Sequence, residues 1–138
     1  MKISDSFKKI IVEEITFVAE KMEQSTQVPE KLFYFSGVHG VLQRVFNLEY
    51  VEELVYIHFV LTATYETFIQ RLKGIQQGEG TIPLLEEQLN KLILTLKELR
   101  DNIQENKDIH ETLKKFVLLS FSTTGNGYYL LQKGMLKI

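Results

Sequence analysis

One stretch of this sequence, from Tyr50 to Ile75, restricts the fold more than any other. Its apolar residues follow one another at steps of three and four, which places them on one face of an α-helix and excludes the alternation of a strand. The positions are Val51, Leu54, His58, Leu61, Tyr65, Phe68, Leu72 and Ile75. Between positions 54 and 61 the opposite face is apolar too, through Val55, Ile57, Phe59 and Val60. Such a helix needs neighbours on several sides, so we expect it to be central.

Helical spacing continues on both sides of this stretch. We expect a first helix from Ser4 or Asp5 to near Ser25, a second from Pro29 to Phe46, a fourth that opens at Thr81 and Pro83, and a fifth that a capping box of Asp108 and Glu111 starts. The predicted inner face of the first helix is Ile3, Phe7, Ile10, Ile11, Phe17, Val18 and Met22. That of the fifth is Ile109, Leu113, Phe116, Val117 and Phe121.

The fourth helix carries a repeat of heptad type. Its members are Leu85, Leu89, Leu92, Leu96, Leu99 and Ile103. Packing inside a bundle and an oligomer interface both explain such a seam. We favour the bundle, because three heptads without clear flanking charges would make a short coiled coil.

The segment from residue 122 to residue 138 is the least determined. Ser122 to Gly127 has a poor helix-forming composition, so we expect a break there. Helical spacing resumes at Tyr128, and a short final helix is the favoured interpretation, with a hairpin or an ordered tail as alternatives. The sequence therefore predicts an all-α fold: residues 1–138 form one domain, an up-and-down helical bundle of five main helices with a short sixth C-terminal helix.

The second predicted helix contains small residues in its interior. Each of Gly37 and Gly40 costs up to about 1 kcal/mol relative to alanine in a helix, so some contact should compensate. The spacing of Ser36 and Gly40 favours the close approach of another helix. A ligand lying against the bare backbone is the alternative.

Composition narrows the classes of function. The chain has no cysteine, which fits a reducing compartment, and we expect a soluble cytoplasmic protein without a membrane span. A net charge of −2 and only three arginines argue against an electrostatic nucleic-acid binder.

Two histidines are candidate metal ligands. His39 and His58 lie at similar distances, about 10–12 Å, from the turn that joins their helices, so they should share one level of the bundle. Glu14 of the first helix should reach the same level. These three residues form a hypothetical divalent-metal site, although the Glu-x-x-His pairs of di-iron bundles are missing. A structural role for the histidines is the competing interpretation.

A loose motif suggests another class. Arg100 and Asp101 are followed by His110, and small helical domains of the HEPN family, some of them RNases, carry an Arg, a polar residue and then a His after four to six residues. The chain resembles these domains in length and helix content, which would imply an RNA-processing or toxin-antitoxin function. Here nine residues separate Arg100 from His110.

The third class is plain interaction. Apolar seams and a tail with Tyr128 and Tyr129 fit a domain that binds a second copy, another protein or a small ligand. A symmetric homodimer is the default among soluble oligomers. We therefore predict a homo-oligomeric interaction or small-ligand-binding module, and we assign no catalytic residue.

Overall fold

All regular secondary structure in the described part of the chain is α-helical. The computed structural model describes residues 3–136, and at positions 39, 46, 125 and 128 it describes the backbone alone. The helices are α1 (Asp5–Gln24), α2 (Val28–Leu48), α3 (Glu52–Gln76), α4 (Ile82–Gln104), α5 (His110–Thr123) and α6 (Gly125–Gln132). This confirms the predicted all-α fold with five main helices and a short sixth, and the favoured helix in the C-terminal segment.

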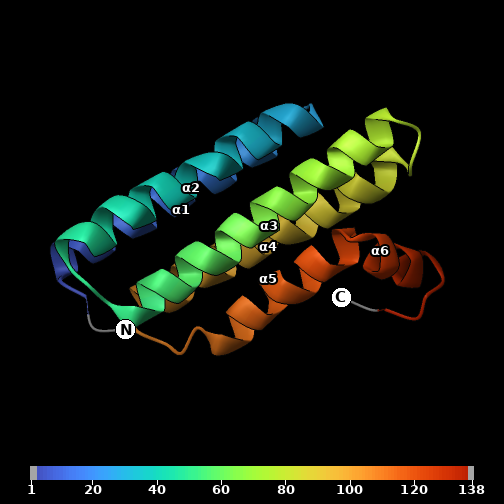
Figure 1. The fold of residues 1–138 in the computed structure, drawn as a ribbon. Coiled ribbons are helices and arrows are strands. Elements are labelled where there is room, and N and C mark those ends of the chain that lie inside the picture. Colours follow the sequence, from blue (N-terminus) through green and yellow to red (C-terminus); the bar gives the residue numbers. More distant parts are fainter. Residues whose placement is uncertain (1–2, 137–138) are drawn as a thin grey trace.

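The helices form three layers (Figure 1). α1 and α2 make one layer, α3 and α4 run up and down beside it, and α5 lies along the far side of α3 and α4. α1 contacts α2 and α4, whereas α2 contacts α3. α5 contacts both α3 and α4, whereas α3 and α4 contact each other only slightly. The expectation that α3 is central holds in this sense, because α2 and α5 contact it.

The heptad seam of α4 is buried within the chain. All six members, from Leu85 to Ile103, are at most 2% exposed. α1 and α5 both contact this helix, and their inner faces complete the same hydrophobic core. The seam is therefore bundle packing, as favoured, because none of its side chains remains for an oligomer interface.

The two apolar faces of α3 differ in burial. In the main stripe Leu54, Leu61 and Phe68 are fully buried, while His58 and Tyr65 are half-buried. On the second face Ile57 is buried, but Phe59 is 66% exposed. The prediction of neighbours on several sides is therefore wrong at Phe59, because no helix in the described part of the chain covers this ring.

The predicted inner faces of α1 and α5 were too wide. Ile10 and Phe17 of α1 are 46% and 47% exposed, and Val117 and Phe121 of α5 are exposed as well. The buried stripe of α1 consists of Ile11, Ile15, Val18, Ala19 and Met22. Because α1 has only two main neighbours, α2 and α4, a narrow stripe is enough to cover their contact.

Two predicted helix starts use different contacts from those expected. Ser4 does not cap α1 with its side chain; its amide and hydroxyl both donate to the carboxylate of Glu49 at 2.8 Å, which ties the start of α1 to the end of α2. The predicted capping box of Asp108 and Glu111 is wrong. α5 begins at His110, and Asp108 accepts a hydrogen bond from the His110 amide at 3.2 Å instead.

The break before α6 is a single residue, Thr124, whose backbone is extended. Its hydroxyl oxygen accepts a hydrogen bond from the Gly127 amide at 3.2 Å and so caps α6. Gly127 must be glycine, because a Cβ there would lie 1.7 Å from the carbonyl oxygen of Phe121. This close approach of α6 to the end of α5 explains the glycine at position 127.

Buried hydroxyl groups attach α5 to its two neighbours. Ser120 donates to the hydroxyl of Thr64 on α3 at 2.8 Å. The Nε2 group of Gln88, a 1% exposed residue of α4, donates to the hydroxyl and the carbonyl oxygen of Ser122 at 2.8 and 3.2 Å. Among the described residues the Oε1 atom of Gln88 has no hydrogen-bond partner. The position of α5 therefore depends on directional contacts as well as on apolar burial.

We expect Ser122→Ala to lower the free energy of unfolding by about 1–3 kcal/mol, because one N–H of the buried Gln88 amide loses its acceptor. Urea denaturation followed by circular dichroism measures this change. In the double variant Gln88→Met, Ser122→Ala both polar partners are gone, so we expect its stability to return towards that of the wild type. A double variant less stable than Ser122→Ala would contradict this account.

Candidate interaction surface

The predicted metal ligands are only partly described. Glu14 is half-buried on α1, with its Oε1 atom 3.7 Å from where a Cβ would stand on Gly37 of α2. His58 is half-buried on α3, and its ring lies 6.0 Å from that of Phe59. The side chain of His39 lies outside the described residues. Within the described part of the chain, no three His, Asp or Glu side chains form a metal-binding group. The three-residue metal site stays a prediction.

The residues of the HEPN-like motif each bind a neighbouring carboxylate. Arg100 on α4 donates from Nε to Asp101 at 3.0 Å. His110 is exposed at the start of α5, with Nδ1 2.5 Å from Oδ1 of Asp108. The hydrogen bond to Asp108 raises the pKa of His110, and the same bond lowers the pKa of Asp108. The contact is therefore an ion pair at mildly acidic pH, and the RNA-processing function stays a prediction.

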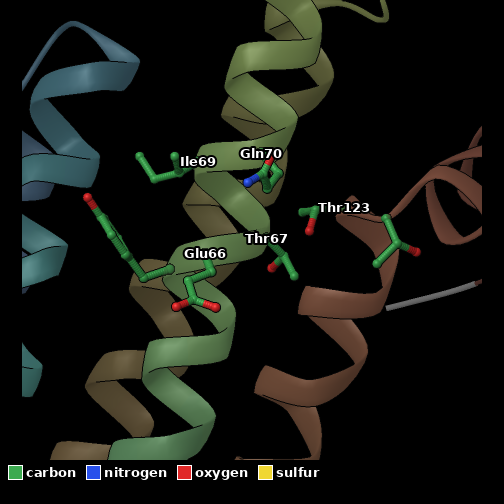
Figure 2. A pocket seen from close by; sticks show the side chains of 7 residues that line it. Glu66, Thr67, Ile69, Gln70 and Thr123 are labelled. Atoms are coloured by element: carbon green, nitrogen blue, oxygen red, sulfur yellow. The ribbon is translucent and has the colours of Figure 1, made fainter.

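A groove of about 490 Å³ lies along α3 near the start of α6 (Figure 2). Figure 2 shows Thr67 and Thr123 between α3 and α5, whereas Ile69 points towards the α2 side. The hydroxyls of Thr67, Thr123 and Thr124 donate to backbone carbonyl oxygens of their own segments at 2.7–2.9 Å. The lining side chains point in different directions, and the hydroxyl protons of the three threonines are already donated to the backbone. The lining therefore does not converge on one ligand atom.

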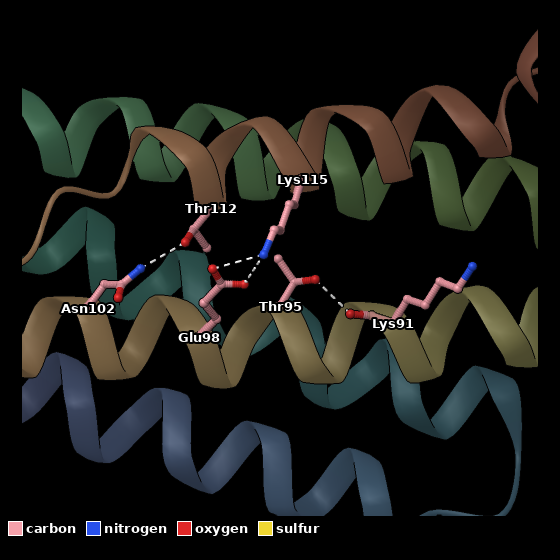
Figure 3. A network of polar contacts seen from close by, with 6 residues as sticks. All are labelled: Lys91, Thr95, Glu98, Asn102, Thr112 and Lys115. Carbon is pink, nitrogen blue, oxygen red and sulfur yellow. Dashed lines mark hydrogen bonds and ion pairs between the residues drawn. The ribbon is translucent and has the colours of Figure 1, made fainter. Parts of the chain in front are cut away.

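A second groove, of about 360 Å³, follows the contact of α4 with α5 (Figure 3). Polar side chains cross this contact as a ladder. Asn102 donates to Thr112 at 2.9 Å, and Lys115 donates to both oxygens of Glu98 at 2.8 and 3.0 Å. The charge of Lys115 is therefore neutralised within the chain. This ladder holds α5 on α4 and explains these polar residues without a ligand.

The outward side of α1 and α2 carries large apolar side chains. We name it the α1/α2 outer face and define it by Phe7, Ile10, Glu14, Phe17, Phe33, Tyr34, Gly37, Gly40, Val41, Arg44 and Leu48. Phe33 is 70% exposed and Leu48 74%, beside the half-exposed Ile10 and Phe17. Sequence reasoning placed Ile10 and Phe17 in the core and did not single out Phe33. The exposure of Phe33 could have been predicted, because this large aromatic residue lies beside, and not within, the predicted apolar stripe of α2.

The α1/α2 outer face has two different ends. At one end three rings stand edge to face, with centroids of Phe17 and Tyr34 6.4 Å apart and those of Phe33 and Tyr34 5.5 Å apart. The ammonium of Lys21 lies 5.8 Å from the Phe17 ring centroid. The other end is a hollow of about 220 Å³, lined by Phe7, Ile10, Val41, Arg44, Val45 and Leu48. The face thus combines a projecting aromatic group with an apolar recess.

The two glycines lie between these ends. Gly37 and Gly40 are both exposed. A Cβ on Gly40 would meet no described atom within 4 Å, so the predicted close approach of another helix of the same chain is wrong at this position. α1 runs beside Gly37 instead, through Glu14. Among the described residues, nothing packs against the bare backbone of Gly40.

Comparison with known protein families, curated proteins and solved structures gives no match for this chain. Within residues 3–136 the helices contain no stretch that is both long and apolar enough to span a bilayer.

The contact between His110 and Asp108 can be tested by titration. We expect Asp108→Asn to lower the pKa of His110, measured by NMR of the imidazole protons, because the charged acceptor is removed. Since folding raises this pKa, the contact stabilises the fold below the unfolded value of about 6.5 and ceases to do so as pH rises through the folded value. Glu111→Gln is the control, as Glu111 contributes least among the causes of the shift. An unchanged His110 pKa in Asp108→Asn would refute the contact.

Gly40→Ala should stabilise the single chain. The position is helical and exposed, and the new methyl group meets open space, so the unfolding free energy in dilute solution should rise by about 0.5–1 kcal/mol. Urea denaturation measures it. Gly127→Ala is the opposite case, because its Cβ collides with the Phe121 carbonyl oxygen and should destabilise the chain. A loss of stability in Gly40→Ala would show that a neighbour occupies that space.

Proposed function

We propose that this chain is a homo-oligomeric interaction protein that associates through the α1/α2 outer face. One observation carries the proposal: Ile10, Phe17, Phe33 and Leu48 lie on two neighbouring helices of one layer and are each 46–74% exposed. Clusters of large apolar side chains on a surface are typical of interaction sites, and aromatic residues are enriched at their centres.

The energetics favour a covered face. Burying apolar surface contributes roughly 25 cal/mol per Å², and a phenyl ring such as that of Phe33 gains most of its value only when water is removed from around it. In the single chain these four exposed side chains contribute little hydrophobic free energy, because water still surrounds much of their surface. A second copy is the proposed partner, since closed symmetric homo-oligomers predominate among soluble assemblies.

The sequence also predicted, as an alternative to self-association, a module that binds a small ligand. Both grooves, the one along α3 and the one between α4 and α5, are open. The hydroxyls of Thr67 and Thr123 in the first, and the ammonium of Lys115 in the second, form hydrogen bonds within the chain. The self-association proposal therefore has the more specific support.

The test is the oligomeric state across concentration. We expect size-exclusion chromatography with light scattering and native mass spectrometry to find a dimer at micromolar concentration. Phe33→Asp should weaken the dimer at least about tenfold, because a hot-spot ring is replaced by a charge that must be desolvated. Leu94→Asp is the matched control, as Leu94 is 65% exposed on α4 and not part of the face.

Two results would contradict the proposal. A chain that stays monomeric at several hundred micromolar would refute self-association. A dimer lost in Leu94→Asp and kept in Phe33→Asp would move the interface to another face. Both substitutions are at exposed sites, so thermal denaturation should show that each variant is folded.

A further inference from the structure

We infer that two copies of this chain interlock about a two-fold axis, with Phe33 of each copy in the apolar hollow of the other and the two α2 helices crossing near Gly37 and Gly40. The inference rests on the proposed self-association and specifies its geometry.

The first step is the fit of the ring to the hollow. Phe33 projects furthest among the three rings, with 70% of its surface exposed. The hollow of about 220 Å³ is lined by apolar side chains apart from Arg44. A buried apolar cavity of about 150 Å³ takes up benzene, so the hollow has room for a phenyl ring. Its apolar walls would remove water from the part of the ring that enters the hollow.

The second step is symmetry. A two-fold interface uses the same surface twice, so each contact between two different places on the face occurs in two copies. The ring at position 33 and the hollow around positions 41–48 lie on the same helix, about 11 residues or 17 Å apart. One two-fold rotation therefore seats both rings at once. A different partner would have to supply both a ring and a recess at this spacing.

The third step is the crossing point. The midpoint between Phe33 and the centre of the hollow falls between Gly37 and Gly40 on α2. Both glycines are exposed, and a Cβ on Gly40 would meet open space in the single chain. Glycine at a crossing point lets two helix backbones approach closely. Close packing of the two α2 helices at the axis would thus offset the cost of placing glycine inside a helix.

The fourth step is charge. Glu30 is exposed one helical turn before Phe33, and Arg44 is exposed at the hollow. Among the described residues, neither forms an ion pair within the chain. When the Phe33 ring of one copy occupies the hollow of the other, the Arg44 guanidinium beside that hollow comes within reach of two groups of the first copy. They are the carboxylate of Glu30 and the face of the Phe33 ring. The charges at the two ends of the face are therefore complementary under the two-fold rotation.

A charge exchange tests this geometry. We expect Glu30→Arg and Arg44→Glu each to raise the dissociation constant of the dimer about five- to tenfold, because each variant brings two like charges together at both symmetric contacts. The double variant Glu30→Arg, Arg44→Glu restores the pair with reversed signs, so its dissociation constant should return to within about twofold of the wild type. Analytical ultracentrifugation of the full chain measures all four proteins, and Glu86→Arg, at an exposed position of α4, is the control for added positive charge.

The outcomes separate the two proposals. Rescue in the double variant supports the interlocked dimer, since only a pair of facing residues is restored by exchange. A double variant as weak as the single ones, in a chain that still dimerises, overturns the interlock and leaves self-association intact. A wild-type chain that remains monomeric refutes self-association itself.

Discussion

The burial of the leucine seam on α4 is the contact on which the rest of the bundle depends. Its six side chains are at most 2% exposed, and a fully buried leucine contributes about 1.5–3 kcal/mol. α1 covers the seam from one side and α5 from the other. The ion pair of Lys97 with Glu23, at 2.5 Å between α4 and α1, lies at the partly exposed margin and adds little to this burial.

The seam alone would not place α5. That helix packs against both α3 and α4, and polar contacts hold it at several levels. They are the hydrogen bonds of Asn102 with Thr112, of Ser120 with Thr64 and of Gln88 with Ser122. Apolar packing has no preferred direction. A buried hydrogen bond has one, because a donor or acceptor that loses its partner inside the protein costs free energy. These contacts therefore favour one register of α5 on α3 and α4.

The layered arrangement also decides which surface remains open. α5 covers one side of the layer formed by α3 and α4, and α1 with α2 covers the other (Figure 1). Nothing in residues 3–136 lies over the outer side of α1 and α2, where Phe33, Leu48 and the hollow are found. Self-association is the proposed consequence, because a second such face supplies both a ring and a recess.

The sequence by itself determined the helices and the centre of the core. Steps of three and four between apolar residues specify one side of a helix, and this was sufficient for the seam of α4 and for Leu54, Leu61 and Phe68 of α3. Tertiary structure decided how wide each buried stripe is, because the width depends on the number of neighbours. Ile10, Phe17, Val117 and Phe121 therefore lie outside the core although their spacing resembles that of core residues. The surroundings of Gly40 and the hollow were equally beyond the sequence, since both depend on the relative placement of two helices.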